Sequence, residues 1–197
     1  MCLDRGRAIT LVKRYQVMYG QIWKTVRSVP VLLLLVWPVT GLSEETLKYD
    51  NTVYAPLENA LTSDNPIIVE EDRAKQMHVT RFVVDGDSAD EWNESLQVIE
   101  THVKDQPQSL DDWYEEFTAR FDPVCTAKWE TIEKKHDSMI FERHVKECPV
   151  HAARHTMFRV LYGRQHVYIM IAEKRPDMEE EARQGWLALL RTAELTG

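Results

Sequence analysis

The stretch CTAKWETIEKKHDSMIFERHVKEC, residues 125–148, decides the fold, because it has the pattern of a β-hairpin with a cysteine at each end. A two-residue turn at His136-Asp137 would bring its two halves face to face. Four pairs then lie opposite one another: Ile132–Phe141, Glu130–Arg143, Trp129–His144 and Cys125–Cys148. Cross-strand pairs of this kind each stabilise a sheet by ~0.2–1 kcal/mol. The register predicts a disulfide between Cys125 and Cys148, which would add roughly 3 kcal/mol on the chain-entropy model.

Strand patterns flank this hairpin on both sides. Residues 78–84 are rich in β-branched residues and end at a turn signal, Asp85-Gly86-Asp87. Downstream, a second hairpin is predicted, with strands at 157–162 and 166–172 around a turn at Gly163-Arg164. Because the latter strand is almost wholly apolar from Val167 to Ala172, we expect it to be central and covered on both faces.

The segment 92–103 fits two structures. Its apolar residues fall at helical spacing, and Ser88 with Glu91 fits a capping box at its start. The run 96–103 also fits a strand that returns along residues 78–84. We favour the strand.

Two helices are predicted. Ser109 is the N-cap of the first, with Asp112 at its third position, and Pro123 stops it. Its apolar stripe is Leu110, Trp113, Tyr114, Phe117 and Phe121. Pro176 opens the second helix, and acidic residues 179–181 lie near its N-terminus, where the helix dipole favours them. Its buried stripe is Met178, Ala182, Trp186, Leu189, Leu190 and Ala193.

This order of elements predicts an α+β fold. We expect an antiparallel sheet of about five to six strands, packed with two main helices and including one disulfide-stapled hairpin. We assign the domain to residues 77–197. Residues 44–76, which Pro56 and Pro66 interrupt, are predicted to be an irregular lead-in, in which a short helix and the strand-like run Ile67-Ile68-Val69 are the candidate elements.

The N-terminal region has the pattern of an export signal. Lys24 and Arg27 precede an apolar run at residues 29–39, which is far shorter than the ~20 residues of a membrane-spanning helix. Met18 is in frame and would give the signal a more ordinary length, and we favour it as the start. We therefore expect a periplasmic or secreted protein.

Cleavage of this signal would leave an acidic chain. We predict that residues 1–43 are removed by cleavage after Ser43; cleavage after Gly41 and an uncleaved anchor are the alternatives. Removal takes six basic residues and one acidic residue from the 24 basic and 32 acidic residues of the chain, and leaves a net charge of −13. Such a surface repels nucleic acid and anionic lipid. We expect a protein partner, which should be basic if the acidic surface serves binding. We expect no binding to nucleic acid and no stable insertion into a membrane.

Three histidines near Cys148 are the candidate metal ligands: His144, His151 and His155. His151 and His155 are four residues apart, the spacing that puts two imidazoles on one face of a helix in zinc proteases. The interval is Ala152-Ala153-Arg154, so the glutamate base is missing and an arginine would oppose a cation. We therefore favour structural or solvated histidines, and we expect no catalytic residues, no metal and no cofactor.

Several segments together carry a resemblance: Val79–Val84, Trp92–Val98, the 125–148 hairpin, Gly163 to Ile169, and Trp186. Over residues 76–195 this pattern resembles small exported bacterial envelope proteins with a PsbP-like or DcrB-like α+β sandwich. The resemblance implies an envelope protein and carries over no catalytic residues.

The sequence favours an exported, non-enzymatic binding or accessory protein of the bacterial envelope that acts through an acidic surface. Two alternatives stay open. One is a metal-dependent or hydrolytic enzyme that uses His144, His151 and His155. The other is an acidic immunity-type inhibitor of a basic partner.

Overall fold

The computed structural model describes residues 45–65, 67–72, 77–86, 88, 91–105, 109–121, 125–147 and 155–197, so the predicted signal peptide lies outside the described residues. The strands are β1 (Thr46–Lys48), β2 (Ile67–Asp72), β3 (Met77–Gly86), β4 (Trp92–His102), β5 (Thr126–Lys134), β6 (Ser138–Glu147), β7 (His155–Tyr162), β8 (His166–Lys174) and β9 (Glu194–Thr196). The helices are η1 (Asn51–Val53), α1 (Ala55–Thr62), η2 (Val103–Asp105), α2 (Leu110–Phe121) and α3 (Glu180–Thr192).

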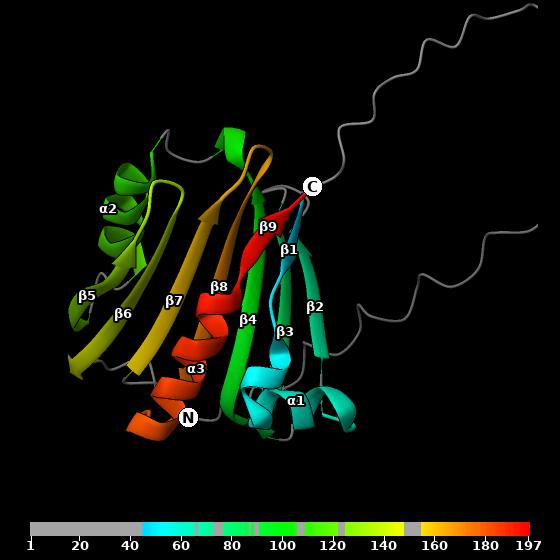
Figure 1. The fold of residues 1–197 in the computed structure, drawn as a ribbon. Helices are drawn as coiled ribbons and strands as arrows, with labels where there is room; N and C mark the ends of the chain where they lie inside the picture. The colour runs from blue at the N-terminus through cyan, green and yellow to red at the C-terminus, as the bar shows by residue number, and fades with distance from the viewer. Residues whose placement is uncertain are drawn as a thin grey trace, which may run out of the picture. The chain divides into compact units, whose positions relative to one another are not determined.

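Seven strands form one antiparallel sheet in the order β2-β3-β4-β8-β7-β6-β5 (Figure 1). β1 and β9 pair separately as a two-stranded antiparallel sheet. Residues of α1 and α3 share one apolar cluster with the large sheet, and residues of α2 share the other. We call the two sides of the sheet the α3 face and the α2 face.

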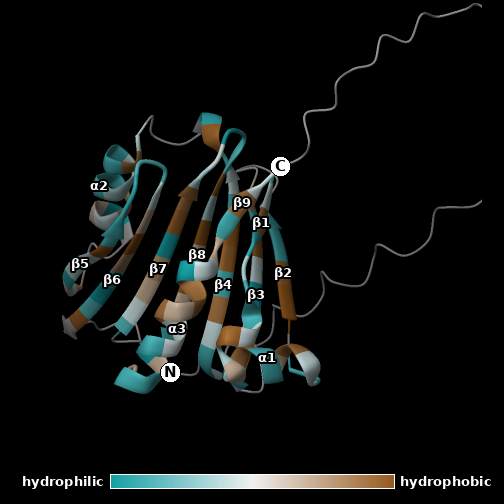
Figure 2. Cartoon of the chain, in the orientation of Figure 1, coloured by the Kyte–Doolittle hydropathy of each residue, from teal (hydrophilic) through white to brown (hydrophobic). Residues whose placement is uncertain are grey.

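The two faces follow from the alternation of side chains along each strand. In β6, Ile140 belongs to the cluster on the α3 face, whereas Met139 and Phe141 belong to the cluster on the α2 face. β7 and β8 are buried along nearly their whole length, and their apolar residues stand out in Figure 2. The prediction of a central strand covered on both faces is therefore confirmed for residues 167–172.

Residues 92–102 form a strand, as we favoured, which pairs with β3 on one side and β8 on the other. The first predicted helix also begins as expected. Ser109 Oγ accepts a hydrogen bond from the Asp112 N–H at 3.1 Å and donates one to the Asp112 carboxylate at 2.7 Å. α3 begins at Glu180 instead of Pro176, because the backbone is still extended at Glu179, its N-cap.

The predicted numbers of strands and helices were wrong. The described residues form a seven-stranded sheet, a two-stranded sheet and three α-helices, in place of five to six strands and two main helices. Most of the added elements lie in residues 44–76, the predicted lead-in. There α1 and β2 agree with the short helix and the strand-like run Ile67-Ile68-Val69 that were candidates, whereas β1 was not expected. Pro56 does not break α1, because it lies in the first turn, where a helix needs no backbone N–H.

The 125–148 hairpin has the predicted turn, but its central register differs. The Lys135 N–H donates to the Ser138 carbonyl at 2.8 Å across the turn. The pairs in the middle of the hairpin are Glu130–Glu142, Trp129–Arg143 and Lys128–His144. They differ by one residue from the predicted pairs because the register shifts between Thr131 and Glu133, where β5 carries an extra residue.

The predicted staple is not part of the described fold. Cys148 lies outside the described residues, so the predicted bond between Cys125 and Cys148 is not described. Strand pairing and the two apolar clusters hold the described domain together. Among the described residues, no helix is long and apolar enough to cross a membrane.

Candidate functional site

Three potential metal ligands meet on the α3 face, where β6 and β7 run side by side. Glu142 and His144 are two residues apart on β6, and such side chains point to the same face of a strand. His155 begins β7 directly opposite His144. The ligand atoms of the three side chains all lie within 4.8 Å of one another. Arg183 reaches them from α3, and we call the four residues the Glu142 cluster.

Each oxygen of Glu142 has two polar neighbours. Oε2 accepts a hydrogen bond from Arg183 Nε at 2.9 Å and lies 3.0 Å from His155 Nε2. Oε1 accepts a hydrogen bond from Arg183 Nη2 at 3.2 Å and lies 3.2 Å from His144 Nε2. The guanidinium thus binds the carboxylate through two parallel N–H groups, a strong and geometrically specific arrangement. Because an ionised carboxylate only accepts hydrogen bonds, both imidazoles donate from Nε2.

The electrostatics of the cluster follow from these contacts. Burial opposes the charge of Glu142, but hydrogen bonds from Arg183, His144 and His155 outweigh it and lower its pKa to about 2. Burial lowers the pKa of His155, and the Glu142 carboxylate opposes this effect. The side chain of His155 is 5% exposed and that of His144 is 41% exposed. The cluster is therefore a buried carboxylate with one imidazole open to solvent.

The structure brings together two of the three predicted candidate ligands. The rings of His144 and His155 lie 4.1 Å apart between centroids, whereas His151 lies outside the described residues. The helical spacing was a wrong premise, because His155 lies in a strand. Sequence reasoning missed Glu142 and Arg183. The two-residue alternation of β6 could have indicated Glu142, but no local pattern connects Arg183 with it.

A second polar group is buried on the α3 face. Glu94 of β4 is 5% exposed, and its Oε1 accepts hydrogen bonds from the Tyr54 hydroxyl and from Trp186 Nε1, the latter at 2.7 Å. The rings of Tyr54 and Trp186 lie 4.4 Å apart between centroids. Burial and the Glu94 carboxylate raise the pKa of Tyr54, so its hydroxyl stays a donor. Glu94 thus connects the sheet to α3 and to the residue that precedes α1.

A pocket of about 500 Å³ opens beside this carboxylate, within the size range of small-ligand sites. Its wall is formed by Tyr54, Ala55, Pro56, Glu94, Lys174, Glu179, Glu181, Ala182 and Gly185, and we call it the Glu94 pocket. The Lys174 ammonium lies 2.7 Å from the Glu179 carboxylate and 3.8 Å from that of Glu94. The hydrogen bond to Glu179 raises the pKa of Lys174, which keeps the ammonium charged.

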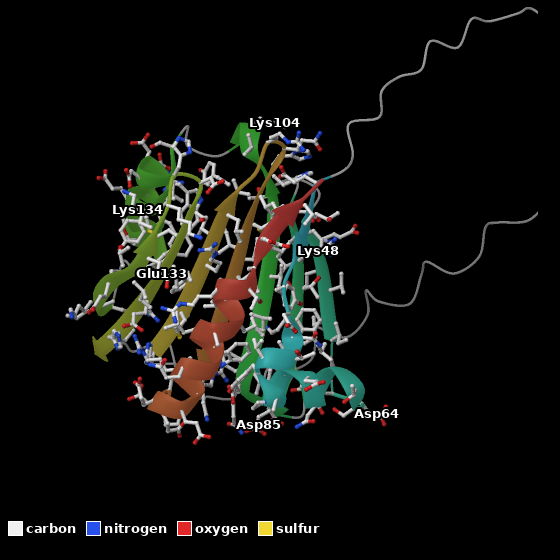
Figure 3. All side chains as sticks on the ribbon, viewed as in Figure 1. Lys48, Asp64, Asp85, Lys104, Glu133 and Lys134 are labelled. Carbon is white, nitrogen blue, oxygen red and sulfur yellow. The ribbon has the colours of Figure 1, made fainter. Side chains whose placement is uncertain are left out.

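The wall of the Glu94 pocket is acidic. Among the described residues, it contains the carboxyl groups of Glu94, Glu179 and Glu181 and one ammonium, that of Lys174. Asp85, labelled in Figure 3 at the end of the domain where α1 lies, contributes a further negative charge near Lys174. A pocket of this charge attracts an ammonium or a guanidinium.

Neither the Glu142 cluster nor the described wall of the Glu94 pocket includes a serine, threonine or cysteine that a neighbouring base could activate. Both arrangements suit binding of a cation. No family model, curated protein or solved structure matches the chain. The resemblance to PsbP-like or DcrB-like proteins therefore stays a prediction.

Proposed function

We propose that the chain is an exported, non-enzymatic binding protein of the bacterial envelope, which holds a basic side chain of a protein partner in the Glu94 pocket. The observation that carries this proposal is the position of Lys174. Its ammonium already lies against Glu179 and near Glu94, so the pocket provides the contacts that a ligand's ammonium needs. Lys174 serves as an internal substitute for the ligand.

The charge balance of the pocket supports a second cation. Three carboxyl groups in the wall stand against one ammonium, and Glu179 and Glu181 are both exposed to solvent. The acidity of the whole mature chain would attract a basic partner over a longer range and speed its association. Because exposed charges are screened beyond ~8 Å at physiological ionic strength, the binding would weaken as salt is added.

The N-terminal edge of the domain is compatible with removal of the signal. The Glu45 carboxylate accepts a hydrogen bond from the Arg164 N–H at 2.9 Å, and the Glu45 carbonyl accepts one from the Tyr168 hydroxyl at 3.0 Å. β1 follows at once, at Thr46. Cleavage after Ser43 would leave all these contacts in place.

The test is titration of the purified domain with an oligolysine peptide, followed by calorimetry at low and high salt. The matched ligand is the same peptide with acetylated lysines, which keeps the length and removes the charge. We expect the charged peptide to bind, more weakly at high salt, and the acetylated peptide not to bind. Equal binding of the two peptides would contradict the proposal.

Two double variants with the same change of charge test whether the peptide binds in the Glu94 pocket. Glu179→Gln with Glu181→Gln should weaken peptide binding by about two- to thirtyfold, the range that two exposed charge pairs give together. Glu115→Gln with Glu194→Gln removes the same charge from exposed positions on α2 and β9 and should leave the affinity unchanged. Equal losses in the two double variants would mean that net charge alone attracts the peptide, which would contradict a site in the pocket.

A further inference from the structure

The Glu142 cluster has the donor set of a transition-metal site. Two imidazole nitrogens and one carboxylate oxygen are common ligands of zinc, and three protein ligands leave a position open for water. Glu142, His144 and His155 supply these atoms from two neighbouring strands. We propose that these three residues bind a divalent transition-metal ion such as Zn²⁺, and that Arg183 competes with the ion for Glu142.

Two contacts within the cluster already have about the separation that ligands of this ion need. Ligand atoms at 2.0–2.1 Å from a tetrahedral zinc lie about 3.3 Å from one another. In the cluster, Glu142 Oε1 lies 3.2 Å from His144 Nε2, and Glu142 Oε2 lies 3.0 Å from His155 Nε2. The two contacts run to different oxygens of Glu142, and the three ligand atoms lie within 4.8 Å of one another, so the side chains have to close around the ion. Each neutral imidazole also has to carry its proton on Nδ1, so that Nε2 can bind the metal.

The scaffold holds the ligands in place. β6 lies between β5 and β7 in the sheet, and the backbone register fixes His144 opposite His155. Glu142 and His155 are buried, which limits their rotamers, whereas the partly exposed His144 gives an ion access from solvent. Sites on regular strands with buried ligands lose little conformational freedom when the metal binds.

Arg183 now supplies the positive charge that a metal ion would supply beside Glu142. Its guanidinium neutralises Glu142 through two hydrogen bonds, and the same interaction raises the pKa of Arg183. Arg183 also has an alternative partner in its own helix, since its Nη1 lies 3.4 Å from the Glu180 carboxylate. A metal ion bound to Glu142 would favour the contact of Arg183 with Glu180 over its contact with Glu142. The positive charge of Arg183 beside the ion makes binding weaker than the ligand set alone would give.

The test is titration of the purified protein with Zn²⁺ by calorimetry, and with Co²⁺ by visible absorption, which reports the coordination geometry. We expect one ion per chain. His144→Asn removes the ligand that is least involved in packing and should weaken binding at least about tenfold. Arg183→Gln removes the competing charge and should strengthen binding by about tenfold or more, as for other charges within ~4–6 Å of a site.

Two histidine variants serve as controls. His136→Asn changes an exposed residue in the β5–β6 turn, and His102→Asn changes the other close histidine pair, in which the rings of His102 and His166 lie 4.5 Å apart. Both should bind zinc as the parent does. Unchanged affinity in the His144 variant, no gain in the Arg183 variant, or loss in either control would overturn the proposal. Circular dichroism of each variant distinguishes loss of a ligand from loss of the fold.

Discussion

Replacement of Glu94 by glutamine weakens an acceptor at the point where β4, α3 and the start of α1 meet. Glutamine is nearly the same size, so the packing around Tyr54 and Trp186 is kept. A hydrogen bond to a charged group contributes about 1.5–3 kcal/mol, against about 0.5–1.5 kcal/mol for a neutral pair. Because two donors share Oε1, the free energy of unfolding should fall by about 2–3 kcal/mol in Glu94→Gln.

Urea unfolding at room temperature, followed by tryptophan fluorescence, measures this loss, since the buried Trp92, Trp113 and Trp186 become exposed when the domain unfolds. The midpoint should fall while the slope stays constant, because the surface exposed on unfolding does not change. The melting temperature should fall by about 4–12 °C, since 1 kcal/mol corresponds to about 2–4 °C in a domain of this size.

A double-mutant cycle isolates the hydrogen bond. Tyr54→Phe removes only the hydroxyl, and its effect should be smaller by about 1 kcal/mol when Glu94 is already glutamine. A Glu94→Gln variant within about 0.5 kcal/mol of the parent would refute the reasoning, because changes of that size are typical of surfaces without such contacts. Strict additivity of the two substitutions would also refute it.

Three further outcomes are expected. Gly185→Ala should lower stability by about 1–3 kcal/mol, although alanine is the better helix former, because its Cβ would lie 2.4 Å from the Tyr54 ring; a melting temperature at or above the parent's would contradict this. Ser109→Ala should cost about 1 kcal/mol through loss of the bond to the Asp112 N–H, and an unchanged denaturant midpoint would argue against the cap. N-terminal sequencing of the exported protein should start near Glu44, whereas an intact apolar run would indicate an anchor.

Local patterns predicted the strands β3 to β8 and the helices α2 and α3. The N-cap at Ser109, the turn at His136-Asp137 and the apolar run of β8 depend on residues close together in the chain, and the structure confirms them. β1 and β9 could not be predicted in this way. Each is only three residues long, and the two strands that pair lie at opposite ends of the domain's sequence.

The candidate sites were harder to predict than the strands. His144 and His155 were singled out because both lie near Cys148 in the sequence. The helical spacing concerned His151 and His155, and it was wrong for His155, which lies in a strand. Arg183 meets Glu142 from 41 residues away in the chain, and Trp186 meets Glu94 from 92 residues away. Such contacts arise from the packing of α3 on the sheet, which the sequence pattern of either element alone does not specify.

We propose that Lys174 occupies the place of a ligand's ammonium in the Glu94 pocket, and the affinity of the Lys174→Gln variant for the oligolysine peptide tests this most directly. Removal of the internal ammonium frees the carboxyl groups of Glu94 and Glu179, so the variant should bind the peptide about tenfold more tightly than the parent. Equal or weaker binding by the folded variant would contradict this role of Lys174.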